Sequence, residues 1–152
     1  MREICGAKTE KIYMDAVCKF SMKKFESMHT VQKARSLLGC IGNKPYVNLE
    51  GMHVKLEYFN PSGSTKDRIA QYIIEKAERH GLLKPGYKVV EATSGNSGIA
   101  FSIVCAVKGY KMIAIMPEGL TNERVSMLKA YGAKIIFTPK AEDLLVEALR
   151  IE

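Results

Sequence analysis

The alternation of strand and helix patterns after residue 41 constrains the fold of this 152-residue chain more than any other sequence feature. Four apolar segments of strand length are each followed by a segment of helical length. Consecutive parallel strands need such crossovers, whereas antiparallel strands can be joined by tight turns. The sequence therefore predicts an α/β fold in three layers, with a four-stranded, mainly parallel sheet between helices.

The expected elements follow from periodicity, turn residues and helix ends. Strands are expected at 54–58, 87–92, 111–116 and 134–138. Helices are expected at 65–80, 97–108, 122–131 and 141–151. The second of these helices is apolar nearly all round, which predicts deep burial. Short loops after the strands should line one edge of the sheet, where ligands bind in open α/β folds.

Residues 1–40 differ from the remainder of the chain. They hold eight of the 23 lysine and arginine residues, no proline and a loose helical pattern. This predicts a basic helical extension of one or two amphipathic helices at 1–40, ahead of a main domain at 41–152. The extension is expected to dock on the main domain or on another subunit.

The net charge of +7 is diffuse, because basic and acidic residues alternate. Aromatic residues are not interleaved with the basic ones as a single-strand nucleic-acid platform would require. No apolar run approaches the roughly 20 residues of a membrane span, and the first residues lack an uninterrupted apolar segment. We expect a cytoplasmic protein that binds neither nucleic acid nor membrane.

The cysteines and histidines indicate neither disulfides nor a metal site. The cysteines are widely scattered, without a Cys-x-x-Cys pair, and are interpreted as reduced thiols: Cys5, Cys18, Cys40 and Cys105. The histidines form no ligand cluster: His29, His53 and His80.

The first loop that can carry chemistry joins a strand to a helix and contains Lys66 near the start of that helix. Unpaired N–H groups and the positive end of the helix dipole disfavour an ammonium ion there. A neutral amine is what attack on an aldehyde requires. The alternative is an ordinary helix start, capped by Ser64 or Thr65, with Lys66, Asp67 and Arg68 in solvent. Spacing alone favours this alternative.

The second loop, residues 91–98, again runs from a strand through a tight turn into a helix. It offers three hydroxyls, one amide and several free N–H groups, which together can hold a small anion such as a carboxylate. The alternative is a capped helix in which Gly95 has a positive φ and Asn96 or Ser97 is the cap. The two interpretations are evenly balanced on the residues alone.

Four motifs in this order and spacing resemble the cysteine synthase and cystathionine β-synthase family, from residue 41 to 139. They are Ile41-Gly42-Asn43-Lys44-Pro45, the segment 55–68 with Pro61-Ser62-Gly63-Ser64-Thr65-Lys66-Asp67-Arg68, Thr93-Ser94-Gly95-Asn96-Ser97-Gly98-Ile99-Ala100, and Met116-Pro117-Glu118. Three positions depart from the usual pattern: Ser62 replaces glycine, Thr65 replaces valine and Ser97 replaces threonine. These changes leave the substrate open among O-acetylserine, O-phosphoserine, serine with homocysteine, and a deaminase substrate, although Glu57-Tyr58-Phe59-Asn60-Pro61 favours cysteine synthase.

The resemblance implies a lyase or transferase that uses pyridoxal 5'-phosphate (PLP) in cysteine biosynthesis. Lys66 would bind PLP covalently and, once displaced by an activated serine, remove the α-proton. Asn96 would hydrogen-bond the cofactor's ring hydroxyl. The whole turn would hold the substrate carboxylate: Thr93, Ser94, Gly95, Asn96 and Ser97. A sulfide or thiol would then add, in a homodimer or in a pair with a related subunit.

Family members are much longer than this chain. Their second half supplies a Gly/Thr-rich loop for the PLP phosphate and a serine at the pyridine nitrogen, and neither is found in these 152 residues. We therefore expect a truncated or partial chain, in which 41–152 is the amino-terminal PLP-enzyme domain. The alternative is a non-catalytic truncated paralogue that binds full-length synthase subunits. Some relatives also bind haem through an amino-terminal Cys and His; Cys18 and His29 resemble that pair in position only, and ordinary structural roles are favoured.

Overall fold

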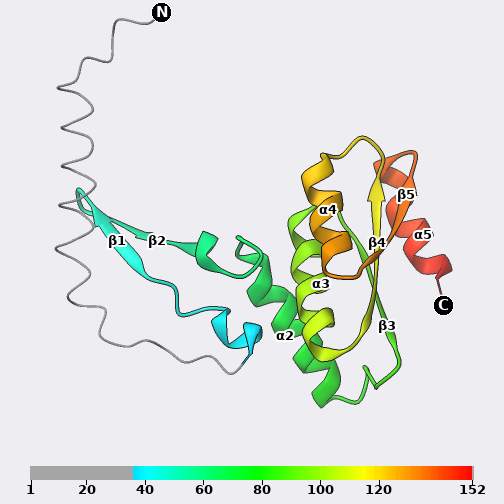
Figure 1. The fold of residues 1–152 in the computed structure, drawn as a ribbon, viewed down its shortest axis with the longest axis horizontal. Helices are drawn as coiled ribbons and strands as arrows, with labels where there is room; N and C mark the ends of the chain where they lie inside the picture. Colours follow the sequence, from blue (N-terminus) through cyan, green and yellow to red (C-terminus); the bar gives the residue numbers. More distant parts are fainter. Residues whose placement is uncertain (1–35, 152) are drawn as a thin grey trace, which may run out of the picture. The chain divides into compact units, whose positions relative to one another are not determined.

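A computed structural model describes residues 36–151 and contains two sheets (Figure 1). The antiparallel hairpin consists of β1 (Tyr46–Leu49) and β2 (Met52–Lys55), and the parallel sheet of β3 (Lys88–Ala92), β4 (Lys111–Pro117) and β5 (Lys134–Thr138). The helices are α2 (Lys66–Arg79), α3 (Asn96–Lys108), α4 (Asn122–Ala130) and α5 (Leu144–Arg150). Three short 3-10 helices are Leu37–Cys40, Glu57–Phe59 and Ala141–Asp143.

The parallel sheet has the strand order β3-β4-β5, so each strand lies beside the next one in the chain. Two right-handed crossovers in the same direction place their helices on the same face. Accordingly α3 and α4 contact one face of the sheet, whereas α5 packs against β3 and β4 from the other (Figure 1). The predicted α/β class, with a parallel sheet between helices, is confirmed.

The core is centred on α3 and β4. Helix α3 contacts α2, α4 and the sheet, and its residues from Gly98 to Cys105 are all buried. In β4 the residues from Met112 to Met116 are buried as well, because both faces of this central strand are covered. The all-round apolar pattern over 97–108 therefore reflects a helix enclosed by neighbouring elements.

The strand predicted at 54–58 as part of the parallel sheet was wrong in extent and partner. β2 ends at Lys55 and pairs only with β1, and Glu57–Phe59 forms a 3-10 helix. Leu49 lies opposite Met52, so the connection is a two-residue turn in which Glu50 and Gly51 have φ values of 49° and 89°. Such a turn matches the twist of a hairpin. The parallel sheet consequently has three strands in the described part of the chain, instead of four.

The predicted basic extension, with Cys18 and His29, lies almost wholly outside the described residues. Its last residues include the 3-10 helix Leu37–Cys40, where Leu38 packs against the core together with Ile41. Among the helices of residues 36–151, none combines the length and the apolar character needed to cross a membrane.

The two cysteines within the described range are free. Cys105 lies inside α3, where burial raises the pKa of its thiol to about 12 and keeps it protonated. Cys40 is exposed. Residues 36–151 contain no group of three or more His, Cys, Asp or Glu side chains suited to a metal ion.

Candidate active site

Lys66 is the first residue of α2, and its side chain is exposed. The backbone N–H group of Lys66 donates to Ser64 Oγ over 3.2 Å, so Ser64 supplies one of the cap interactions expected at this helix start. The next residue, Asp67, is completely buried, and its Oδ2 accepts a hydrogen bond from the Ser62 N–H over 2.8 Å. Asp67 thus folds the loop back onto the helix, and Lys66 projects from a fixed turn. The sequence interpretation of Asp67 as solvated was wrong.

Arg68 joins the same loop to the rest of the protein. Its Nε and one terminal nitrogen donate to the two carboxylate oxygens of Glu57, each over 3.0 Å, in the bidentate geometry that makes such pairs strong. Asn60 is 3% exposed; it donates to Glu57 and accepts from the Gly42 N–H. Gly42 also lies against Arg68, because a Cβ atom built there would be 3.1 Å from the guanidinium. These contacts explain why the motif at 41–45 accompanies the motif at 55–68.

Glu57 should make the folded state sensitive to acid. The hydrogen bonds from Arg68, aided by Asn60 and Lys55, lower its pKa from 4.5 to about 2. A carboxylate with a lowered pKa stabilises the fold above pH 4.5, and that contribution disappears as the pH falls towards 2. Glu57→Gln should therefore lower the urea midpoint at pH 7, with the difference from wild type closing between pH 4.5 and pH 2. Glu142→Gln, at an exposed side chain, is the control. A Glu57→Gln deficit that stays constant with pH would contradict this account.

Thr93 organises the second loop from the inside. It is 3% exposed, and its Oγ1 accepts hydrogen bonds from the N–H groups of Gly95 (3.1 Å) and Gly98 (3.0 Å). The same oxygen lies 2.9 Å from Ser97 Oγ. Thr93 therefore caps α3, in place of the predicted Asn96 or Ser97. Gly95 has a φ of 162°, which is extended backbone, whereas the predicted positive φ meant the left-handed region that favours glycine.

Two side chains of this loop remain available. Ser94 and Asn96 are exposed, and neither side chain hydrogen-bonds to another residue within 36–151. The first turn of α3 adds N–H groups that no helical carbonyl can accept. A small anion could therefore be held by the loop through Ser94, Asn96 and the helix start. The roles predicted for Thr93 and Ser97 as substrate ligands stay predictions, since both hydroxyls are engaged within the loop.

The two loops lie at the same end of a pair of helices. Near the carboxyl end of α2, Glu78 accepts hydrogen bonds from Lys108 Nζ (2.7 Å) and Tyr110 Oη (2.9 Å), so the carboxyl ends of α2 and α3 lie close together. Lys66 lies twelve residues before Glu78, and Asn96 lies twelve before Lys108. Each stretch spans about 18 Å of helix. Since α2 and α3 also pack against each other and run in the same direction in Figure 1, the helix starts that carry Lys66 and Asn96 lie towards the same end of the pair.

Glu91 is a further titratable group next to this loop. It lies in β3, near the Ser97 hydroxyl. Burial raises the pKa of Glu91, and the polar Ser97 hydroxyl only partly opposes this. Perturbed carboxyls of this kind gather at functional sites. In the sequence Glu91 looked like an ordinary strand residue, and only its half-buried position distinguishes it.

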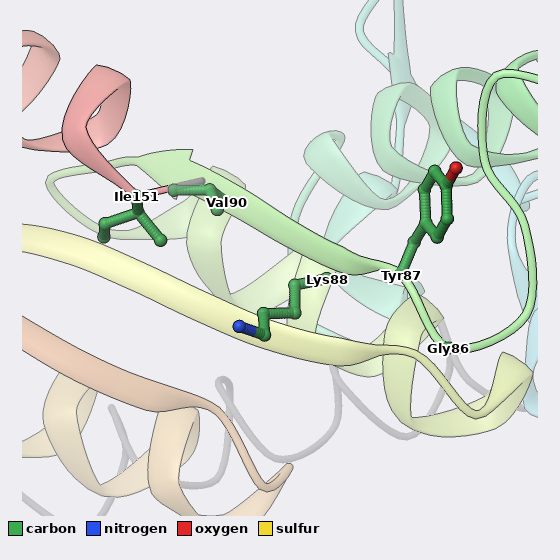
Figure 2. A pocket seen from close by; sticks show the side chains of 5 residues that line it. All are labelled: Gly86, Tyr87, Lys88, Val90 and Ile151. Carbon is green, nitrogen blue, oxygen red and sulfur yellow. The ribbon is translucent and has the colours of Figure 1, made fainter.

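A shallow pocket of about 300 Å³ lies elsewhere, along β3. Figure 2 shows Val90 beside Ile151, with Tyr87 pointing away from them. The pocket is lined by Gly86, Tyr87, Lys88, Val90 and Ile151. None of the predicted site residues lines it, and Lys88 is its one titratable group apart from the Tyr87 phenol. Because Tyr87 points away from the other lining side chains, the pocket does not bring these two groups together (Figure 2).

The sequence and fold match those of characterised proteins. Residues 37–152 match the family model described as "Pyridoxal-phosphate dependent enzyme". Cysteine synthase of Staphylococcus aureus is 53% identical over 110 residues, which cover 67% of this chain and 36% of the relative. Cystathionine beta-synthase of Apis mellifera is 40% identical over 140 residues, covering 80% and 28%. The chain thus spans about a third of the length of these curated relatives.

The structural match agrees with the sequence match. A hydrogen sulfide-producing enzyme of Fusobacterium nucleatum superposes with a TM-score of 0.72 at 41% identity, over 77% of this chain and 41% of that one. The two proteins are therefore similar in sequence as well as in fold. The chain therefore belongs to the family of pyridoxal-phosphate-dependent enzymes that includes the cysteine synthases.

Proposed function

We propose that this chain supplies the lysine and the substrate-carboxylate loop of an enzyme that replaces the β-substituent of an activated serine to make cysteine. The observation that carries the proposal is that Lys66 and Asn96 begin two helices, α2 and α3, that pack against each other and are joined near their carboxyl ends. The identity of 53% to a cysteine synthase supports this choice of reaction within the family. Binding of O-acetylserine and sulfide, a homodimeric state and a cytoplasmic location are part of the proposal.

The residues of the two loops fit PLP. Lys66 has an exposed amine on a loop fixed by Asp67, and the loop at 94–97 offers uncharged donors suited to a carboxylate or a ring oxygen. When bound, PLP withdraws electrons from the substrate's α-carbon. Lys66 Nζ would receive the α-proton as a general base, and Asn96 would hydrogen-bond the cofactor's ring. Ser94 and the free N–H groups of α3 would fix the carboxylate and so orient the bond to be broken.

The direct test is product formation by the full chain in the presence of PLP. O-acetylserine or O-phosphoserine would be supplied with sulfide, and serine with homocysteine, and the products identified by mass spectrometry. We expect cysteine from O-acetylserine. Cystathionine as the main product, or elimination without thiol addition, would contradict the proposed reaction.

A second candidate is a non-catalytic subunit that pairs with a full-length synthase. Several large apolar side chains on the described surface favour it, because such surface is usually covered by a partner: Tyr46 (65% exposed), Met52 (66%) and Leu149 (76%). Co-purification with a full-length synthase, combined with no turnover by the chain alone, would favour this candidate. A monodisperse, active preparation without such a partner would exclude it.

A further inference from the structure

Arg124 contacts the candidate substrate loop from a different strand–helix unit. It lies in the first turn of α4, and one terminal nitrogen donates to the Ser94 carbonyl oxygen over 3.1 Å. A Cβ atom built on Gly95 would lie 3.1 Å from Arg124 Nε and 3.4 Å from Cζ. The guanidinium thus covers the Ser94–Gly95 peptide, in the space that a side chain at position 95 would occupy.

The Ser94–Gly95 peptide is held at both of its polar ends. Its N–H group points inward and donates to Thr93 Oγ1 over 3.1 Å, while its carbonyl points outward to Arg124. If the peptide rotated, its N–H group would lose Thr93 Oγ1 and would face the Arg124 guanidinium, where one donor meets another. The bond that ties Gly95 to the oxygen that also accepts from the Gly98 N–H would be lost. The orientation of this peptide therefore fixes the shape of the loop at the start of α3.

The contact with Arg124 is suited to hold that orientation. A hydrogen bond from a charged donor is stronger than a neutral one, and Arg124 forms no ion pair with another residue within 36–151. The planar guanidinium lies against Gly95, which offers no side chain to displace it.

We propose that Arg124 is a positioning residue for the carboxylate-binding loop: it fixes the Ser94–Gly95 peptide so that the loop's N–H groups converge on the α-carboxylate of an amino-acid substrate. This inference rests on the proposed function for the identity of the ligand, and on the hydrogen bond to Ser94 for the mechanism. It couples the loop after β3 to the helix after β4, so that two neighbouring loops at one sheet edge act together.

Hydrogen–deuterium exchange of the full chain without cofactor tests the positioning role directly. In Arg124→Ala the amides of Gly95 and Gly98 should exchange about tenfold faster, because one of two bonds that hold the peptide is lost. Arg124→Lys keeps a charged donor and should give an intermediate rate. Lys129→Ala removes the same charge from an exposed position of the same helix and should leave the loop unchanged. Equal loop exchange in wild type and Arg124→Ala would overturn the proposal, as would equal acceleration in Lys129→Ala.

A second measurement concerns the ligand. In the PLP-loaded chain Arg124→Ala should raise KM for O-acetylserine about tenfold, with kcat changed less than about twofold, since the loop binds the carboxylate in ground state and transition state alike. A fall in kcat at unchanged KM would overturn the positioning role. If the chain shows no turnover, the proposed reaction fails, whereas faster exchange in Arg124→Ala would still support the role of Arg124 in the loop.

Discussion

Replacing Lys66 with alanine is expected to abolish covalent attachment of PLP to this chain. Lys66 is the lysine that starts α2, the helix that packs against α3. Borohydride reduction of the PLP-treated wild type should leave a pyridoxyl group on the peptide that contains Lys66. In Lys66→Ala this label should fall about a hundredfold, and any turnover about a thousandfold or more, because the proposed general base is lost together with the nucleophile.

Lys76→Ala is the matched control for this experiment. Lys76 is an exposed lysine of the same helix, and its ammonium lies 5.7 Å from the centre of the Tyr72 ring. Its removal should leave both the label and its position unchanged. Label spread over several lysines in the wild type, or retained at full yield in Lys66→Ala, would refute the assignment of Lys66.

Substituting alanine for Gly98 is expected to destabilise the fold by roughly 2–3 kcal/mol. A Cβ atom there would lie 2.4 Å from Thr93 Cγ2, much closer than two carbon atoms can approach. Alanine is otherwise favoured over glycine within a helix by about 1 kcal/mol, so propensity alone predicts the opposite sign. The clash should dominate, because Thr93 is buried and its hydroxyl is bound to two backbone N–H groups. Urea denaturation would measure the change.

A second substitution identifies the clash as the cause. Thr93→Ser removes the methyl group that Gly98→Ala would meet but keeps the hydroxyl. The double variant should therefore recover about half or more of the stability that Gly98→Ala loses, although Thr93→Ser alone costs about 1 kcal/mol for the lost methyl. Purely additive losses would show that the methyl contact is not responsible.

The helices and the strands of the parallel sheet could be predicted closely from the sequence. Helix α3 ends at Lys108, before Gly109 with a φ of 80°, because glycine readily adopts this left-handed cap. Glycines with a positive φ also follow the ends of α2 and α4, at Gly81 and Gly132. The hairpin was missed because its turn has Glu50 at a φ of 49°, and glutamate is not a residue whose presence predicts that conformation. Val54, Leu56 and Tyr58 alternate, but in the structure Val54 lies in β2, Leu56 lies between the two elements and Tyr58 lies in the 3-10 helix.

The candidate site was predictable only in its local part. The loops of Lys66 and Thr93 are contiguous in sequence, so their residue types indicated their chemistry. Arg124 lies 30 residues from Ser94 and carries no local signal; only the pairing of β3 with β4 brings its helix to that loop. The cap of α3 was assigned to the wrong residue for a related reason. Thr93 reaches forward to Gly98 across the whole turn, while Asn96 and Ser97 already belong to the helix.

The bonds of Glu78 to Lys108 and Tyr110 have a geometric consequence for the opposite ends of α2 and α3. The two helices are joined near their carboxyl ends, and their amino ends carry Lys66 and the 93–97 loop. About 18 Å of helix separates Glu78 from Lys66, so one degree of change in the angle between α2 and α3 moves the start of α2 by about 0.3 Å. Displacements of about 1 Å can reduce a reaction rate a hundredfold, so a change of about three degrees in the angle between α2 and α3 would strongly slow the proposed reaction. The side-chain contacts of Glu78 therefore help to set the separation of the helix starts that carry Lys66 and Asn96.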